Sequence, residues 1–230
     1  MTTIDIKDML EAAVHFGHKT QKWNPKMRPY IFGVKNNIHI FDLQKSMDSL
    51  KKALEYVRQL SAEGKTILLV STKQQAAALI VEVAKETKMP YVINKWMPGL
   101  LTNFSTMKRR IKYLNDLIEQ EKTGELEKYT KKEASDFKKD ITKLEVALGG
   151  VKTVRKLPDA LFVADIVRDD TTVKEANKLG IPVIGITDTN ADPDTVTYPI
   201  PGNDDAIKSL TYLITAVKDA ILEGRKSKKD

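Results

Sequence analysis

Cysteine is absent from the 230 residues, and the chain also lacks any long apolar run. Without cysteine there is no disulfide framework, no thiol nucleophile and no cysteine-ligated zinc site. The segment MTTIDIKDMLEAAVHF carries acids where a secretion signal carries bases, and no apolar run reaches the roughly 18 residues of a transmembrane helix. We therefore expect a protein of a reducing compartment, cytoplasmic and without membrane contact.

The known phosphate-binding and nucleophile motifs are missing as well. No GxxxxGK[ST], no GxGxxG after a strand-like run and no GxSxG occurs in the chain. These absences favour a non-enzymatic protein over a catalyst, and we expect no catalytic residue, no cofactor and no bound metal.

Residues 15–41 contain no acidic residue and are rich in basic and aromatic ones. HFGHKTQKWNPKMRPYIFGVKNNIHIF holds five lysines and arginines, interleaved with Phe, Trp and Tyr and without helical periodicity. Basic side chains neutralise phosphates and exposed rings stack on bases, so the segment predicts an RNA-binding surface. Trp23, which follows Lys22, fits a stacking residue and a half-buried packing residue equally well. The RNA contacts expected here are Lys19, Lys22, Trp23, Lys26, Arg28 and Lys35.

Short apolar runs alternate with amphipathic segments along most of the remaining chain. Strand-like runs occupy residues 66–71, 91–94, 161–165 and 182–187, and helical patterns occupy 46–64, 73–88 and about 203–222. A further helix between the last two strands shows capping-box spacing at Thr172 and Glu175. Strands joined by helices need crossover connections, which build a parallel sheet covered on both faces. The pattern predicts an α/β fold with a doubly wound parallel sheet.

The segment 104–150 interrupts this alternation, because it holds no strand-like run and two apolar stripes with heptad spacing. Each stripe alone is too short for a stable helix, so we expect the two to pair as an antiparallel α-helical coiled-coil hairpin. Two helices packed flat on the domain are the alternative. We thus divide the chain into a discontinuous α/β domain of residues 1–103 and 151–230, with a basic N-terminal extension at 1–45, and an inserted hairpin at 104–150. The stripes are Met107, Ile111, Leu114 and Ile118, then Phe137, Ile141, Leu144 and Leu148.

The hairpin segment carries much of the chain's net positive charge. Between residues 104 and 156 there are fourteen basic and nine acidic residues, within a net charge of +7 for the whole chain. Lys108, Arg109 and Arg110 are consecutive, and neighbouring helical positions lie about 100° apart around the axis, so some of them face solvent or phosphate. We add these three residues to the predicted RNA contacts.

Two further groups of residues support competing hypotheses. The crevice at the carboxyl ends of parallel strands is a ligand site in doubly wound sheets, and Asp165 and Asp188 would lie beside it, so a nucleotide-binding α/β enzyme is the rival function. Caps and turns are the favoured explanation of these aspartates. His15 and His18 are spaced to share a divalent ion with an acid. Two histidines are a weak signal, and a role in orienting the loop or touching RNA phosphate is favoured.

Several segments of the chain resemble one known family. HFGH, WNPKMRPYIFG and IHIFDLQ lie in the basic opening, followed by STKQQA at 71–76, KWMPGLLTNF at 95–104, PDALFVAD at 158–165, and LGIPVIGITDTNADPD with YPIPGNDDAI between 179 and 207. In this order they are similar to the second protein of the bacterial small ribosomal subunit over nearly the whole chain. Pro98 departs from the family, in which glycine is common at this place, and it removes a backbone donor.

The resemblance implies a flavodoxin-like doubly wound sheet with an inserted coiled-coil hairpin. It implies a structural, non-catalytic role in translation, on the ribosome in the cytoplasm. The expected partners are the ribosomal RNA of the small subunit and other small-subunit ribosomal proteins, including the large first protein of the subunit, which the family helps to dock. Phosphate neutralisation and shape, rather than base readout, would provide most of the RNA binding.

Overall fold

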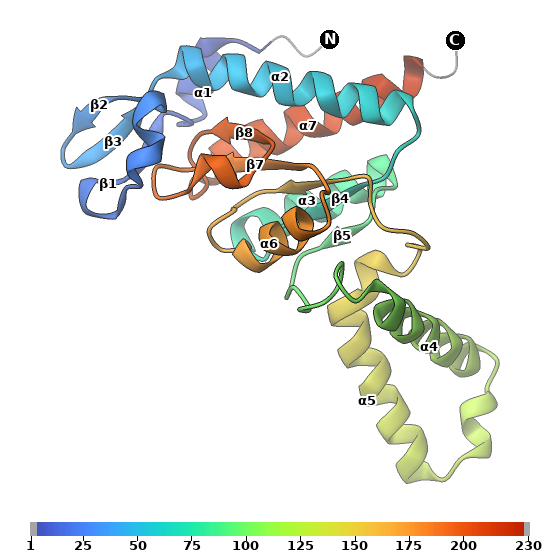
Figure 1. Ribbon diagram of the computed structural model, residues 1–230. Coiled ribbons are helices and arrows are strands. Elements are labelled where there is room, and N and C mark those ends of the chain that lie inside the picture. Colours follow the sequence, from blue (N-terminus) through green and yellow to red (C-terminus); the bar gives the residue numbers. More distant parts are fainter. Residues whose placement is uncertain (1–3, 228–230) are drawn as a thin grey trace.

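A five-stranded parallel sheet forms the centre of the computed structural model, which describes residues 4–227 (Figure 1). Residues 1–3 and 228–230 of the predicted α/β domain lie outside the described residues. The sheet order is β5-β4-β6-β7-β8, and every neighbouring pair is parallel. Numbered within the sheet, this is the 2-1-3-4-5 order of flavodoxin-like folds, which confirms the predicted fold class. The strands are β4 (Ile67–Val70), β5 (Tyr91–Val92), β6 (Ala160–Val163), β7 (Val183–Thr187) and β8 (Tyr198–Pro201).

Four helices cover one face of this sheet. They pack on alternating strand residues such as Ile67, Leu69 and Phe162, and together these side chains form a continuous apolar core. α2 and α7 run side by side (Figure 1) and approach closely because Gly224 has no side chain; a Cβ there would overlap the carbonyl oxygen of Arg58. The four helices are α1 (Ile6–Glu11), α2 (Leu43–Ala62), α3 (Gln74–Thr87) and α7 (Ile207–Ser227).

The opposite face is covered by α6 (Asp170–Lys178), by the segment 96–101 and by the base of a helical hairpin. The hairpin consists of α4 (Phe104–Lys122) and α5 (Lys131–Leu148), joined through the 3-10 helix η3 (Glu125–Lys128). It is inserted between β5 and β6 and projects away from the sheet (Figure 1). Within residues 4–227, no helix combines the length and apolar character that crossing a membrane requires.

The two apolar stripes of the hairpin have different surroundings. Met107, Ile111 and Leu114 of α4 are buried in the same core as the sheet, whereas Ile141 and Leu144 of α5 are only partly buried. Heptad spacing shows which side of a helix is apolar, but it does not show what covers that side. The sequence therefore could not tell a stripe that packs on the sheet from one that packs on the other helix. The base of α4 lies on the sheet, and the outer part of α4 pairs with α5. The arrangement therefore combines the predicted hairpin with the alternative of helices packed on the domain. The boundaries of the two domains stay a prediction.

The basic N-terminal segment forms a small antiparallel sheet that the sequence pattern did not predict. Its order is β1-β3-β2, with β1 (Phe16–Lys19), β2 (Ile31–Lys35) and β3 (Ile38–Phe41). Asn36 and Asn37, with φ of 52° and 61°, make the two-residue turn between β2 and β3, as in a type I′ hairpin. The 3-10 helices η1 (Thr20–Lys22) and η2 (Pro25–Tyr30) connect β1 to β2.

One prediction about local structure was wrong, and one strand was not predicted. The helix between β6 and β7 begins after Asp169, and Thr172 and Glu175 are buried rather than forming a capping box. β8 was missed because its sequence, YPIP, contains two prolines, which are tolerated at the edge of a sheet but argue against a central strand. The connection from β7 to β8 contains only the short 3-10 helix η5 (Pro193–Thr195).

Candidate nucleic-acid interface

The small N-terminal sheet is held against the carboxyl end of β7 by contacts with Thr189. A bulge in β1 between Phe16 and Lys19 brings the backbone of His18 close enough to donate to Thr189 Oγ1 at 2.8 Å. Asn24 N donates to the Thr189 carbonyl at 2.7 Å. Gly17 permits this approach, because a Cβ at residue 17 would lie 2.5 Å from Thr189 Cγ2. The basic segment is therefore attached to the rigid sheet.

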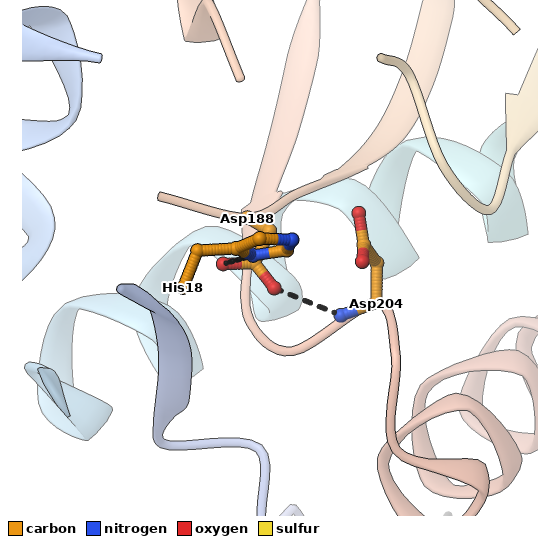
Figure 2. A group of neighbouring side chains, drawn as sticks. All are labelled: His18, Asp188 and Asp204. Carbon is orange, nitrogen blue, oxygen red and sulfur yellow. Dashed lines mark hydrogen bonds and ion pairs between the residues drawn. The ribbon is translucent and has the colours of Figure 1, made fainter. Parts of the chain in front are cut away.

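His18 forms the main side-chain attachment. Figure 2 shows its ring against the carboxylate of Asp188, where Nδ1 lies 3.0 Å from Oδ1. The hydrogen bond to Asp188 raises the pKa of His18 to about 8. Asp188 is 1% exposed and also accepts hydrogen bonds from the backbone N–H groups of Thr189 and Asp204. A buried carboxylate with these donors orients the histidine.

Lys73 occupies the crevice at the carboxyl ends of β4 and β6. Its Nζ lies 3.1 Å from Asp165, 2.8 Å from Asp204 and 2.7 Å from Asp205. Burial would lower the pKa of Lys73, but its hydrogen bonds with Asp204 and Asp205 raise it. Burial, together with the charges of Asp188 and Asp165, raises the pKa of Asp204 to about 7. The charged groups at the place where a doubly wound enzyme would bind a nucleotide are thus paired with one another.

One group of side chains has the composition of a metal site. Ligand atoms of His18, Asp188 and Asp204 lie within 4.8 Å of one another (Figure 2). His15, the other histidine considered from the sequence, packs instead on Phe16 with ring centroids 4.1 Å apart, and burial and Lys35 lower its pKa. Asp188 is bound by the donors described above and Asp204 by Lys73, so the carboxylates have partners from within the chain.

The predicted RNA contacts of the N-terminal segment differ in availability. Lys26 forms ion pairs with Asp192 at 2.8 Å and Asp194 at 3.0 Å, so its charge is shared with two acids. Trp23 is 36% exposed, and its ring lies 5.2 Å from that of His39, so it both packs on a neighbouring ring and remains accessible. The other four are exposed and form no ion pair with any residue in 4–227: Lys19, Lys22, Arg28 and Lys35.

A basic groove of about 980 Å³ follows the outer side of α4 and the segment 152–155. Lys108 and Arg109 line it, while Arg110 is exposed beside it. The only acid among its lining residues within the described chain is Glu119. Four further bases were not singled out from the sequence, since α4 and residues 152–155 are brought together only by the fold: Lys112, Lys122, Lys152 and Arg155.

Glu175 fixes the segment that leads into α4. Its carboxylate accepts hydrogen bonds from Trp96 Nε1 at 3.0 Å and Gly99 N at 2.7 Å. It accepts two more from the backbone N–H groups of Leu101 and Thr102, both at 3.1 Å. Burial would raise the pKa of Glu175, but the hydrogen bonds from Thr102 and Trp96 lower it. The missing N–H of Pro98 is not needed in this network, and Trp96, 6% exposed, is a packing residue.

The chain is similar to one family of proteins along nearly its whole length. The family described as ribosomal protein S2 matches residues 9–224. The chain is 51% identical over 222 residues to the small ribosomal subunit protein uS2 of a Nitratiruptor species, an alignment that covers 96% of this chain and 83% of that protein. For the uS2 proteins of Dictyoglomus thermophilum and Geotalea uraniireducens the identities are 49% and 50%, covering 98% and 97% of this chain and 92% and 88% of those proteins.

Proposed function

The chain belongs to the ribosomal protein S2 family, and we propose that it binds the ribosomal RNA of the small subunit through two basic surfaces. Membership of this family makes it a structural protein of the small ribosomal subunit that serves in translation, and we propose that it has no catalytic activity. The first surface, called the N-terminal surface below, consists of Lys19, Lys22, Arg28 and Lys35. The second is the groove along α4, called the hairpin groove, which includes Lys108 and Arg109.

The observation that supports RNA binding most strongly is the unpaired charge of the N-terminal surface. Its four cations are exposed and lack ion-pair partners in the described chain, and no acid occurs from residue 12 to residue 41. Like charges gathered without counter-charges repel one another, and a polyanion relieves that repulsion. The attachment to Thr189 and Asp188 holds the surface in place, so little ordering entropy is lost on binding.

The hairpin groove complements this surface in a different way. Six bases against one acid along a concave surface favour a phosphate backbone over a protein with mixed charges. The groove also contains Lys152, which is paired with Glu145 at 2.5 Å, so five of the six bases are free of ion pairs in the described chain. Contacts between basic side chains and the phosphate backbone of RNA position a protein without reading the base sequence.

Contacts with neighbouring ribosomal proteins, including the large first protein of the subunit, are the second part of the proposal. They rest on the family, as does a location on the ribosome. The rival, a nucleotide-binding enzyme, is disfavoured because the charged side chains at the strand ends that it would use, Lys73 and three carboxylates, are paired with one another.

The test is a salt titration of binding to small subunits that lack this protein. Reversing the charge of Lys22 with Arg28, or of Lys108 with Arg109, to glutamate should weaken binding and lower the slope of log affinity against log salt. Each lost phosphate contact lowers the slope by about 0.7 to 0.9. Lys51→Glu with Lys52→Glu, two exposed positions of α2, is the matched control for charge and number.

Circular dichroism and urea unfolding check that each variant is folded, as expected for exposed positions, where substitutions change stability by about 0.5 kcal/mol or less. A loss confined to the first two double variants supports the proposal. Equal affinity and salt slope for all three would contradict it. Lys26→Ala beside Lys22→Ala gives a second comparison, because the charge of Lys26 is already shared with Asp192 and Asp194 and its removal should matter less.

A further inference from the structure

Phe32 is the most exposed large apolar side chain among the described residues, with 81% of its surface accessible. Burial of a phenylalanine side chain removes a large apolar surface from water and so stabilises a fold, and the exposed Phe32 contributes little in this way. Phe41, on the neighbouring strand β3, is only 2% exposed, so the same small sheet buries one phenylalanine and presents the other.

A β-bulge accounts for the exposure of Phe32. Ile31 pairs with Phe41 and Gly33 pairs with Ile40, so Phe32 is an extra residue between two successive pairs of the β2/β3 ladder. Bulges of this kind redirect a side chain and recur at sheet edges beside functional sites. β2 is an edge strand, and the tight Asn36–Asn37 turn ties it firmly to β3. The phenyl ring is therefore presented on a rigid support and not on a loose loop.

The charges on the small sheet that carries Phe32 indicate what kind of partner its ring would meet. Lys35 lies on the same strand and Lys19 on the far strand of the same small sheet, both exposed and without ion pairs in the described chain. Next along β2, Gly33 leaves open space, since a Cβ there would have no neighbour within 4 Å. An apolar protein surface docking here would have to carry many acids to match its surroundings. A nucleotide supplies a flat ring and a negative charge together.

We propose that Phe32 stacks on an unpaired nucleobase of the small-subunit RNA while Lys35 and Lys19 neutralise the phosphates beside it. The inference rests on the proposed RNA-binding function and adds the kind of RNA that is bound. A base inside a duplex is stacked on both sides, so the RNA at this place presents a looped-out or bulged nucleotide. Stacking on an aromatic ring tolerates any base, which suits a position that the chain reads by shape.

The test compares four substitutions of Phe32 in binding to small subunits that lack this protein. Phe32→Ala and Phe32→Leu should each weaken binding by about 5- to 150-fold, the range expected for loss of one stacked base. Their salt slope should equal that of the wild type, because no cation is removed. Phe32→Tyr and Phe32→Trp keep a stacking face and should bind within about threefold of the wild type. Because the Phe32 side chain is 81% exposed, these substitutions should leave the free energy of unfolding nearly unchanged, and urea unfolding of each variant checks this.

Lys35→Ala, measured in parallel, separates this inference from the proposed function. A lower salt slope for Lys35→Ala with unchanged affinity for all Phe32 variants would overturn the stacking inference and leave RNA binding intact. No effect from Lys35→Ala and none from Phe32→Ala would overturn the stacking inference and remove Lys35 from the proposed RNA contacts, while the double variants of Lys22 with Arg28 and of Lys108 with Arg109 test RNA binding itself. Full binding by Phe32→Leu with loss in Phe32→Ala would also overturn stacking, since it would assign Phe32 to an apolar contact with a protein neighbour.

Discussion

Replacing His18 by glutamine should remove a pH-dependent part of the chain's stability. In the folded chain the hydrogen bond to Asp188 raises the pKa of His18 to about 8 from 6.5. A raised pKa means that the folded state binds this proton more tightly than the unfolded state does. The stabilisation is therefore complete below about pH 6.5 and is lost as the pH rises through 8.

The magnitude follows from the two pKa values. The difference between 6.5 and about 8 corresponds to about 2 kcal/mol. The His18 side chain is 20% exposed, and screening by solvent reduces this to about 1 kcal/mol. Asp204 adds a separate effect, since burial raises its pKa from 3.8 to about 7, so that stability also falls as the pH rises from about 4 to 7. Because the charge of Asp204 also raises the pKa of His18, the difference between wild type and His18→Gln reports the two linked groups together.

The measurement is urea unfolding at pH 6.0, 7.0 and 8.5 in low salt. The free energy of unfolding of the wild type should exceed that of His18→Gln at pH 6.0 by about 1 kcal/mol more than it does at pH 8.5. His15→Gln is the matched control with the opposite sign, because burial and Lys35 lower the pKa of His15. Identical pH dependence in the wild type and His18→Gln would refute the ion pair with Asp188 as the attachment of the N-terminal sheet.

Two further substitutions test the packing of the interface. Gly17→Ala should lower the free energy of unfolding by about 1 to 3 kcal/mol, because the added Cβ would lie 2.5 Å from Thr189 Cγ2. The control Gly33→Ala should leave the free energy of unfolding unchanged, because a Cβ there meets open space. Equal thermal unfolding of the two variants would count against the close approach of Gly17 to Thr189. Glu175→Gln should lower the free energy of unfolding in urea by about 1 to 3 kcal/mol, because an amide NH2 would face some of the buried donors of residues 96–102. Glu82→Gln, at an exposed position, serves as the control. An unchanged free energy of unfolding for Glu175→Gln would show that these hydrogen bonds do not stabilise the fold.

The sheet was predictable because its strands carry a local signal. Runs such as ILLV and VIGIT are fully buried and apolar, and helices with a single apolar stripe separate them, so the order of elements was readable. β8 could not be predicted, since its two prolines argue against a central strand and are tolerated only in a strand at the edge of a sheet. The capping-box spacing at Thr172 and Glu175 misled because Glu175 serves residues 96–102, which are remote in sequence.

The composition of the candidate interface was readable from the sequence, and its detailed arrangement was not. The absence of acids indicated the N-terminal segment, but nothing local distinguished Lys26 from Lys22, since the partners of Lys26 lie more than 160 residues away, at Asp192 and Asp194. The bulge that exposes Phe32 depends on register between β2 and β3, which single-sequence patterns do not define. The hairpin groove likewise exists only after folding brings residues 152–155 beside α4.

The central claim is that the N-terminal surface and the hairpin groove both bind ribosomal RNA, and the most direct measurement is a map of the assembled small subunit at side-chain resolution. If both surfaces bind RNA, phosphate oxygens will lie within about 4 Å of the side-chain nitrogens of Lys22, Arg28, Lys108 and Arg109, the limit for an ion pair. A map in which these four side chains face solvent or other proteins, with RNA against a different face, would contradict it.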